Sequence, residues 1–353
     1  MRLDLGSHDY VQTLKGQKLR FPNFDGLVKD YPRGISPHYE VLKEMTNAEL
    51  ELLVGPGPRY DALVACDCAL NSATWFPNAT FDALRLNAWF VAFLYVWDDE
   101  FDSPHFSDLG QDPDASEKLR LDTIEHIKKY LGDKRPQTGI KAEDVHMIIA
   151  SFNPVGEAAG FRMNRGQRKV FMDECIRYVL ASGDEQRSEL SGRAPTIEQY
   201  MHIRMGTSAV SAIVALIEYM TGIDLGDELR ADDDITLVRE ATNCVINIMN
   251  DVFSLRRELI FPFYNNAVAV LYHENQDLQK AVDETYKIVA DAVANLEAAH
   301  TRLLKKYPGR REDLEVFVTG AKGMCTGNIE WSKRIRRYHL GVPRFDGTTE
   351  ITL

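Results

Sequence analysis

The chain has 353 residues, of which 44% are hydrophobic and 27% are charged, and its formal net charge is −12. This composition is typical of a folded globular protein and argues against intrinsic disorder. The acidic balance excludes a broad nucleic-acid-binding surface, because there is no basic excess to meet phosphates.

The chain begins with residues 1–40, a segment rich in Pro and Gly that we expect to form an extended N-terminal arm. From residue 41 to 340, apolar residues recur with a helical period, and breaks fall at turn sequences such as VGPGP, SGRAP and KYPGR. Residues 341–353 form a short C-terminal tail. The expected helices cover residues 40–53, 59–73, 79–103, 115–131, 141–150, 157–182, 196–221, 232–261, 263–274, 276–306 and 311–339.

These helices follow one another as a single unit. The sequence has no strand pairs joined by hairpin turns, no repeat of fixed period and no long Gly/Ser linker. It therefore predicts one all-α domain, a bundle of helices. The stretches 84–97 and 208–220 are apolar around most of the helix circumference, so we expect both in the interior of the bundle.

The cysteines and the apolar runs indicate the cellular compartment of the protein. Five cysteines are scattered without paired C-x-x-C motifs, so we expect reduced, mostly buried thiols and no zinc site. The N-terminal sequence lacks the apolar stretch of a secretory signal. No apolar run reaches the roughly 18 residues needed to span a bilayer. We therefore expect a soluble, cytoplasmic protein with no membrane partner.

An acidic cluster, DDEFD at residues 98–102, directly follows the apolar run 88–97. On a helix Asp98 and Asp102 share a face, where like charges repel, and the repulsion grows near an apolar interior. Negative charge is also disfavoured at the C-terminal end of a helix. Taken alone, the cluster also fits a solvated helix end, but a bound cation would offset its charge. Mg²⁺ suits the site, because it combines carboxylates with phosphate oxygens.

A second cluster lies in the sequence INIMNDVFSLRRELI. Asn250, Ser254 and Glu258 are four residues apart, so each is rotated only about 40° from the last and all three share one helix face over roughly 12 Å. All three side chains offer oxygen, which again suits Mg²⁺. Arg257 beside them is a ready partner for phosphate.

The order of the two clusters resembles the signature pair of microbial class I terpene synthases, D-D-x-x-D followed about 150 residues later by N-D-x-x-S-x-x-R-E. The likeness covers roughly residues 60–340 and is greatest to the fungal sesquiterpene cyclases. Arg204, 46 residues before Asn250, matches the diphosphate-sensing arginine of the family. Arg337 and Tyr338 match its Arg-Tyr pair, with Trp331 six residues before the arginine.

The resemblance implies an all-α, single-domain class I terpenoid synthase fold around a central active-site cavity. It implies three Mg²⁺ ions bridged by the substrate diphosphate, with Asp98, Asp102, Asn250, Ser254 and Glu258 as the metal ligands. Asp99 is either a further ligand or the partner of an arginine. Arg204, Arg337 and Tyr338 are the catalytic candidates, and together with Arg257 they would donate hydrogen bonds to the diphosphate.

The resemblance also implies a helix break after Arg204, with a linker at Thr207 and an effector at Ser208. The linker is often Asp in the family and the effector often Gly or Ala, so this chain departs from the common pattern. The carbocation left by ionisation needs a dry cavity and benefits from aromatic faces, at ~0.5–2 kcal/mol each. Candidate cavity aromatics are Tyr95, Phe76, Trp331 and Trp75, although each could equally be an ordinary core residue.

The sequence thus predicts Mg²⁺-dependent ionisation of an acyclic prenyl diphosphate, most simply farnesyl diphosphate, to a sesquiterpene hydrocarbon or alcohol, by a monomer or homodimer. Alternatives are an acyclic terpene alcohol synthase on geranyl or farnesyl diphosphate, an all-trans prenyltransferase, and a catalytically silent helical binding protein. A prenyltransferase would need a second D-D-x-x-D where this chain carries Asn250 to Glu258. The intact ligand sets argue against a silent protein.

Overall fold

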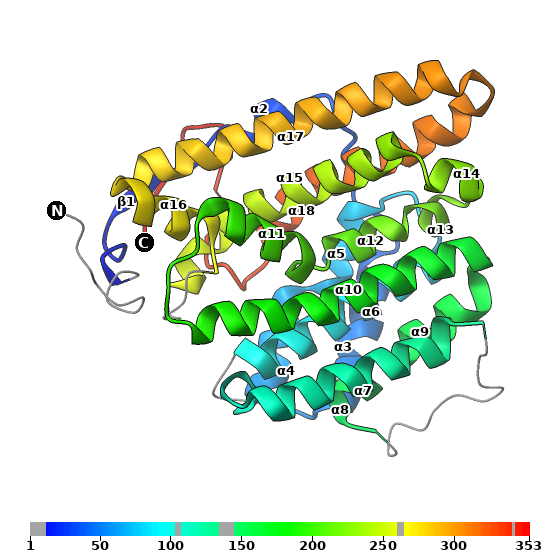
Figure 1. Ribbon diagram of the computed structural model, residues 1–353, viewed down its shortest axis with the longest axis horizontal. Helices are drawn as coiled ribbons and strands as arrows, with labels where there is room; N and C mark the ends of the chain where they lie inside the picture. The colour runs from blue at the N-terminus through cyan, green and yellow to red at the C-terminus, as the bar shows by residue number, and fades with distance from the viewer. Residues whose placement is uncertain (1–11, 103–106, 134–144, 260–264, 341–342) are drawn as a thin grey trace.

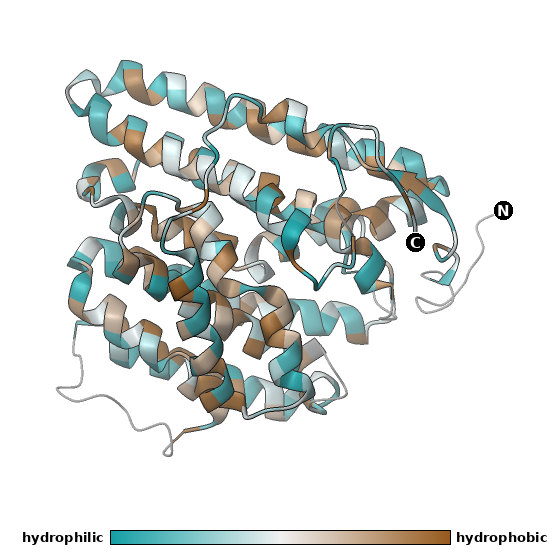
Figure 2. Cartoon of the chain, turned by 180° about the vertical axis from the view of Figure 1, so that it is seen from behind, coloured by the Kyte–Doolittle hydropathy of each residue, from teal (hydrophilic) through white to brown (hydrophobic). Residues whose placement is uncertain are grey.

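The computed structural model describes residues 12–102, 107–133, 145–259, 265–340 and 343–353, except for the side chain of Asp102. Within these ranges the chain is almost entirely helical, and Figure 1 shows the helices packed into one bundle. The predicted all-α fold class is confirmed. The long helices alternate between hydrophobic and hydrophilic residues along their length (Figure 2), as expected for helices with one buried face.

The elements in chain order are β1 (Lys18–Arg20), α2 (Phe24–Leu27), α3 (Tyr39–Val54), α4 (Pro58–Cys66), α5 (Cys68–Trp75), α6 (Phe81–Asp102), η1 (Leu109–Gln111), α7 (Pro113–Leu131), α8 (Met147–Ala150), α9 (Asn153–Arg162), α10 (Arg165–Leu190), α11 (Ile197–Thr207), α12 (Val210–Ala215), α13 (Ile217–Thr221), α14 (Gly226–Arg230), α15 (Asp233–Glu258), α16 (Ala267–Asn275), α17 (Leu278–Lys306), η3 (Pro308–Arg310), α18 (Arg311–Arg334) and β2 (Glu350–Thr352). In Figure 1, α17 runs alongside α15 and α18, and α10 crosses the middle of the bundle.

Two predicted helices are each broken at a residue with left-handed backbone. The helix expected over 59–73 is divided at Asp67, whose φ is +47°, and the one over 196–221 is divided at Ala209, whose φ is +56°. Asp67 offsets part of the strain, because its side chain accepts a hydrogen bond from the Leu70 N–H at 3.0 Å and caps α5. Neither break is marked by Gly or Pro, so the periodicity did not reveal them. The break at Ala209 agrees with the helix break after Arg204 that the resemblance implied.

The ends of two other predicted helices also shift. The helix expected over 157–182 is two helices, because Asn164 begins α10 with a reciprocal capping box to Gln167. The helix expected over 311–339 ends at Arg334, so the Arg337-Tyr338 pair lies in the irregular segment that follows. Part of the expected helix 141–150 and the start of the one over 263–274 lie outside the described residues.

The two ends of the chain meet in a short antiparallel sheet that the sequence did not predict. Leu19 of β1 faces Ile351 of β2. Beside this sheet a cluster of buried rings joins the arm and the tail to α15: Phe21 lies edge-on to Phe345, with ring centroids 5.0 Å apart, and Phe345 stacks on Phe253 at 4.0 Å. The N-terminal arm and the C-terminal tail therefore pack on the outer side of the helix that carries the second motif.

Candidate active site

A cavity of about 870 Å³ opens between the helices that carry the two motifs. Its walls come mainly from α5, α6, α11, α15 and α18, and from the segment after α18. The predicted residues that line it are Tyr95, Asp98, Asp99, Arg204, Thr207, Ser208, Asn250, Arg257, Glu258, Trp331, Arg337, Tyr338 and Trp75. Residues as far apart in the chain as Trp75 and Tyr338 thus contribute to one site, as the arrangement of signature motifs implied.

The acidic end of α6 meets this cavity with few hydrogen-bond partners among the described residues. Asp98 accepts one hydrogen bond, from the Tyr178 hydroxyl at 3.0 Å, and loss of water around the carboxyl raises its pKa to about 6. Asp99 is buried, and one of its oxygens lies 3.9 Å from the Arg337 guanidinium. Its other oxygen has no hydrogen-bond partner in the described part of the chain. Of the two alternatives for Asp99, the arginine pairing is therefore the one seen here.

Asp102 is the last residue of α6, and its side chain lies outside the described part of the chain. Its place as a metal ligand stays a prediction.

The polar side chains on the α15 face, in contrast, all make hydrogen bonds within the protein. The Asn250 side chain accepts from Arg204 Nη2 at 3.1 Å and donates to the Tyr338 hydroxyl at 2.6 Å. Glu258 accepts from the Asn266 amide at 2.8 Å, and burial raises its pKa. Ser254 Oγ donates to the Asn250 carbonyl at 2.8 Å. Ser254 is the one predicted α15 ligand that does not line the cavity, because it is turned against its own helix in this way.

Arg204 is fixed by a residue that the sequence reasoning passed over. The fully buried Asp251 accepts from Arg204 Nη2 at 2.9 Å and Nε at 3.2 Å, from the Tyr200 hydroxyl at 2.6 Å, and from the Ala267 N–H at 3.0 Å. The sequence does mark this residue, because Asp251 is the second residue of the N-D-x-x-S-x-x-R-E motif. It lies one position from Asn250, about 100° around the helix, so it faces α11 instead of the ligand face.

The segment after α18 is held by the end of α4. The Arg337 N–H donates to the Ala65 carbonyl at 3.3 Å, and the Trp331 indole N–H donates to the Cys66 carbonyl at 2.9 Å. The break at Asp67 ends α4 here, and the last carbonyls of a helix have no partner within it. They are therefore available to hold Trp331 and Arg337, which line the cavity.

Aromatic side chains pack against the Arg337-Tyr338 pair. The Arg337 guanidinium lies over the Tyr95 ring at 4.7 Å, and Trp331 packs edge-on against Tyr338 with ring centroids 5.7 Å apart. Tyr95 and Trp331, which were expected as cavity aromatics, both line the cavity beside the Arg-Tyr pair. Phe76 is a correction, because it is buried but does not line the cavity. It is the C-cap residue of α5, where the chain leaves the helix, so its side chain leaves the face that carries Trp75.

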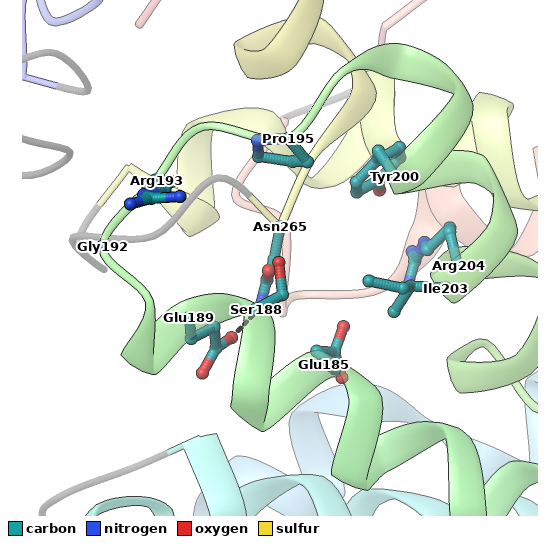
Figure 3. Close-up of a pocket in the computed structure, with 10 residues that line it drawn as sticks. All are labelled: Glu185, Ser188, Glu189, Gly192, Arg193, Pro195, Tyr200, Ile203, Arg204 and Asn265. Carbon is teal, nitrogen blue, oxygen red and sulfur yellow. Dashed lines mark hydrogen bonds between the residues drawn. The ribbon is translucent and has the colours of Figure 1, made fainter.

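Two glutamates on α10 were not predicted at all. Figure 3 shows Glu185 and Glu189 beside Tyr200 and Arg204 around a pocket that adjoins the main cavity, and both glutamates also line the main cavity. Burial and the nearby charges of Glu189 and Asp98 raise the pKa of Glu185 to about 8, although Arg204 works in the opposite direction. No motif marks them, since α10 is an ordinary amphipathic sequence.

The residues present fit divalent metal ions. The donors are hard oxygens from carboxylates and an amide, the set that Mg²⁺ prefers. No group of three His, Cys, Asp or Glu side chains is already assembled among the described residues, because the donors stand on two different helices. The unpartnered Asp99 oxygen, and the burial that raises the pKa of Asp98, make negative charge at the end of α6 costly without a counter-ion. A cation with an anionic ligand would balance it.

Helix α11 and the segment that follows it are the one part of the described chain that raises the question of a membrane span. None of the described helices is by itself long and apolar enough to cross a membrane. Helix α11 taken together with the following Val210–Thr221 passes a test of length and composition, with a bend of 46° at the break. The second half of this pair is almost wholly buried in the bundle.

Comparison with known proteins agrees with this geometry. Residues 89–295 match the model of terpene synthase family 2, C-terminal metal binding. The chain is 27% identical to sesquiterpene cyclase hepA of Aspergillus oryzae over 337 residues, covering 93% of this chain and 91% of that protein. It is also 27% identical to pristinol synthase of Streptomyces pristinaespiralis over 325 residues, covering 87% and 83%.

Solved structures share the fold at lower identity. Linalool/nerolidol synthase from Streptomyces clavuligerus, in complex with 2-fluorogeranyl diphosphate, has a TM-score of 0.73 at 18% identity, covering 87% of this chain and 98% of that one. An α-eudesmol synthase has a TM-score of 0.72 at 18% identity, covering 86% and 96%. Since the family model spans more than half of the chain, this protein belongs to the metal-binding terpene synthase family and is a class I terpene synthase.

Proposed function

We propose that the protein catalyses the Mg²⁺-dependent ionisation of farnesyl diphosphate and converts it to a sesquiterpene, with release of diphosphate. One observation carries the proposal: a single cavity is lined by Asp98 of α6, by Asn250 and Glu258 of α15, and by the cations Arg204 and Arg337. Acidic oxygen donors and guanidinium groups around one hollow suit a metal-bound diphosphate ester, because each kind of charge has its counterpart.

In this proposal Arg204, Arg257, Arg337 and Tyr338 bind the diphosphate. Arg204 is already oriented by Asp251, and Arg337 by the end of α4 and the Tyr95 ring. Their donors are therefore preorganised for negative charge that grows on the leaving group when the allylic C–O bond breaks, which is how such donors lower a barrier. No side-chain nucleophile takes part.

Asp98, Asp102, Asn250, Ser254 and Glu258 would hold the metal, for which three Mg²⁺ ions are the expectation. When bound, these ions would neutralise the diphosphate and make it a better leaving group. Before that, Asn250 and Glu258 must give up the hydrogen bonds from Arg204 and Asn266 that they accept in this structure. Both donors line the same cavity, so they remain within reach of the diphosphate.

The rest of the cavity suits a hydrocarbon chain. Val91, Leu94, Val210 and Ile213 line it, with the faces of Tyr95 and Trp331 beside them. Apolar walls exclude water from the carbocation, and aromatic faces stabilise it. A volume of about 870 Å³ is at the upper end of the usual range for small-ligand sites. The names of the similar curated proteins, sesquiterpene cyclases and synthases, favour a fifteen-carbon substrate.

The cavity is built by one chain, so activity would need no second copy, whether the protein is a monomer or a homodimer. We place the enzyme in the cytoplasm, because all five cysteines are free and four of them are buried.

Incubation of the purified protein with farnesyl diphosphate and Mg²⁺ tests the proposal. Diphosphate release and volatile products should both appear, and EDTA should abolish both. Absence of diphosphate release from geranyl, farnesyl and geranylgeranyl diphosphate would contradict the proposal. Elongated products with added isopentenyl diphosphate would instead support a prenyltransferase.

A further inference from the structure

Three buried asparagines line the cavity: Asn71 of α5, Asn247 of α15 and Asn328 of α18. Each side chain is at most 3% exposed. None belongs to the metal or diphosphate groups described above. A buried amide without a full set of hydrogen bonds is costly, by about 1–3 kcal/mol for each unpaired group. Three of them, outside the metal and diphosphate groups, need an explanation.

The hydrogen bonds of Asn247 determine which end of its amide is free. Asn243 donates to the Met205 carbonyl at 2.8 Å, so its own oxygen is the acceptor in the local network. That oxygen accepts hydrogen bonds from the Ser208 hydroxyl at 3.1 Å and from the Asn247 amide N–H. Asn247 therefore uses its nitrogen toward Asn243 and keeps its oxygen Oδ1 for the cavity. Among the described residues no donor reaches that oxygen.

The Asn328 amide is oriented in the same way as that of Asn247. Its amide nitrogen donates to the Ile246 carbonyl on α15 at 3.4 Å. A backbone carbonyl can only accept, so Asn328 also keeps its oxygen free, and no donor from the described residues reaches it. Asn71 adds a third group, because its Oδ1 is buried without a partner in the described part of the chain.

Helix α18 packs against both α5 and α15, and the three amides line the one cavity between these helices. Asn328 reaches α15 through Ile246, the residue before Asn247. Its neighbour Gly327 lies against α5, so closely that a Cβ there would come within 2.5 Å of the Thr74 carbonyl. Asn71 lies one turn before Thr74. Asn247 is three residues from the predicted ligand Asn250, or about 4.5 Å along the helix axis, so it lies about one turn from the predicted metal ligands of α15.

We propose that these amides hold one water molecule, and that this water captures the carbocation, so that the main product is a terpene alcohol. The inference rests on the proposed ionisation of a prenyl diphosphate. Asn247 Oδ1 and Asn328 Oδ1 accept the two O–H groups of the water, and the Asn71 amide N–H donates to its oxygen. Buried waters commonly make about three such bonds. A water that donates both hydrogens keeps a lone pair for the cation.

The step balances without another reactant. The water oxygen gives its lone pair to the cationic carbon, and a C–O bond forms. The resulting oxonium loses one proton, which passes to the released diphosphate, the strongest base in the cavity. The amides remain neutral throughout and act by holding and orienting the water.

The test is turnover of farnesyl diphosphate by the full-length protein in ¹⁸O-labelled water, with diphosphate release measured in parallel. We expect the main product to be an alcohol that carries one ¹⁸O atom. Asn247→Leu and Asn328→Leu should each lower the alcohol-to-hydrocarbon ratio about tenfold, while diphosphate release stays within about threefold of the wild type. Asn87→Leu is the matched control, since Asn87 is a buried amide outside the cavity, and it should leave the ratio unchanged.

The outcomes separate the two proposals. Diphosphate release with only unlabelled hydrocarbons would overturn the water site and leave the ionisation intact. A labelled alcohol whose fraction is the same in both leucine variants would also overturn the assignment to these amides. Failure to release diphosphate from any prenyl substrate would overturn the ionisation itself and, with it, the water site. Circular dichroism of the variants separates a change in product from a loss of fold.

Discussion

The two helix faces that would share the metal ions are built very differently. The α15 face is satisfied before any ligand arrives: Asn250 is bonded to Arg204 and Tyr338, and Glu258 to Asn266. The acidic end of α6 is not, because Asp98 has one hydrogen bond and one oxygen of Asp99 has none in the described part of the chain. The comparison indicates that the α15 side chains are paired within the protein, whereas α6 supplies charge that only a ligand can balance.

The largest effect is expected on catalysis, from substitutions on the satisfied face. Glu258→Gln keeps the shape and the hydrogen bond to Asn266 but removes the charge, and Asn250→Leu removes the oxygen donor. Each should lower kcat at least about 10³-fold, the scale on which loss of preorganised electrostatic groups acts. Helical circular dichroism should be unchanged. Full activity in either variant would remove that residue from the metal site.

A stability measurement distinguishes the two faces most clearly. Asp251→Asn leaves Arg204 without its buried partner and should cost about 3 kcal/mol in the free energy of unfolding. Asp98→Asn removes an uncompensated charge instead and should leave the metal-free protein as stable as the wild type or slightly more stable. Urea unfolding of the two variants without Mg²⁺ measures this. Equal destabilisation would mean that the two faces do not differ.

The pH dependence of the metal-free protein gives a smaller effect. Since burial raises the pKa of Glu185 from 4.5 to about 8, the unfolded chain loses this proton first as pH rises. The folded state is therefore relatively destabilised between about pH 4.5 and pH 8, and stability falls with rising pH in that window. We expect Tm to be lower at pH 8 than at pH 6 by about 2–5 °C. Glu185→Gln should flatten this slope, and an equally steep slope would exclude Glu185 as its cause.

The smallest effect concerns the product mixture. Trp331→Phe keeps an aromatic face but loses the hydrogen bond to the Cys66 carbonyl, and Trp331→Ala loses both. Diphosphate release should fall by less than about tenfold, because a neutral hydrogen bond contributes about 1 kcal/mol. The ratio of products should change in both variants, and more in the alanine one. Gas chromatography of the volatiles measures it, and an unchanged ratio in the alanine variant would exclude Trp331 from the cavity wall.

Much of this arrangement was predictable from the sequence because helical periodicity and motif spacing are local signals. The i, i+4, i+8 spacing put Asn250 and Glu258 on one face, and both line the cavity. The same spacing did not show that Ser254 turns back to its own helix. That depends on a rotamer, which a residue pattern does not contain.

Other features depend on contacts between distant segments. Cys66 meets Trp331 across 265 positions because α4 ends at Asp67, a break without Gly or Pro. No sequence motif marks Glu185, and its place beside Arg204 follows only from the packing of α10 against α11. The pairing of β1 with β2 joins the two ends of the chain through three residues on each side, too few for a strand signal. These features arise from tertiary packing, which overrides weak local preferences.

The central claim is that Asp98 and Glu258 bind divalent ions joined by one diphosphate. A crystal structure with Mn²⁺ and inorganic diphosphate tests it most directly, because Mn²⁺ can be located by its anomalous signal. The account predicts at least one ion within about 2.3 Å of an Asp98 oxygen and at least one at the same distance from Glu258, with diphosphate oxygens shared between them. Ions bound at only one of the two helices, or diphosphate bound elsewhere, would contradict it.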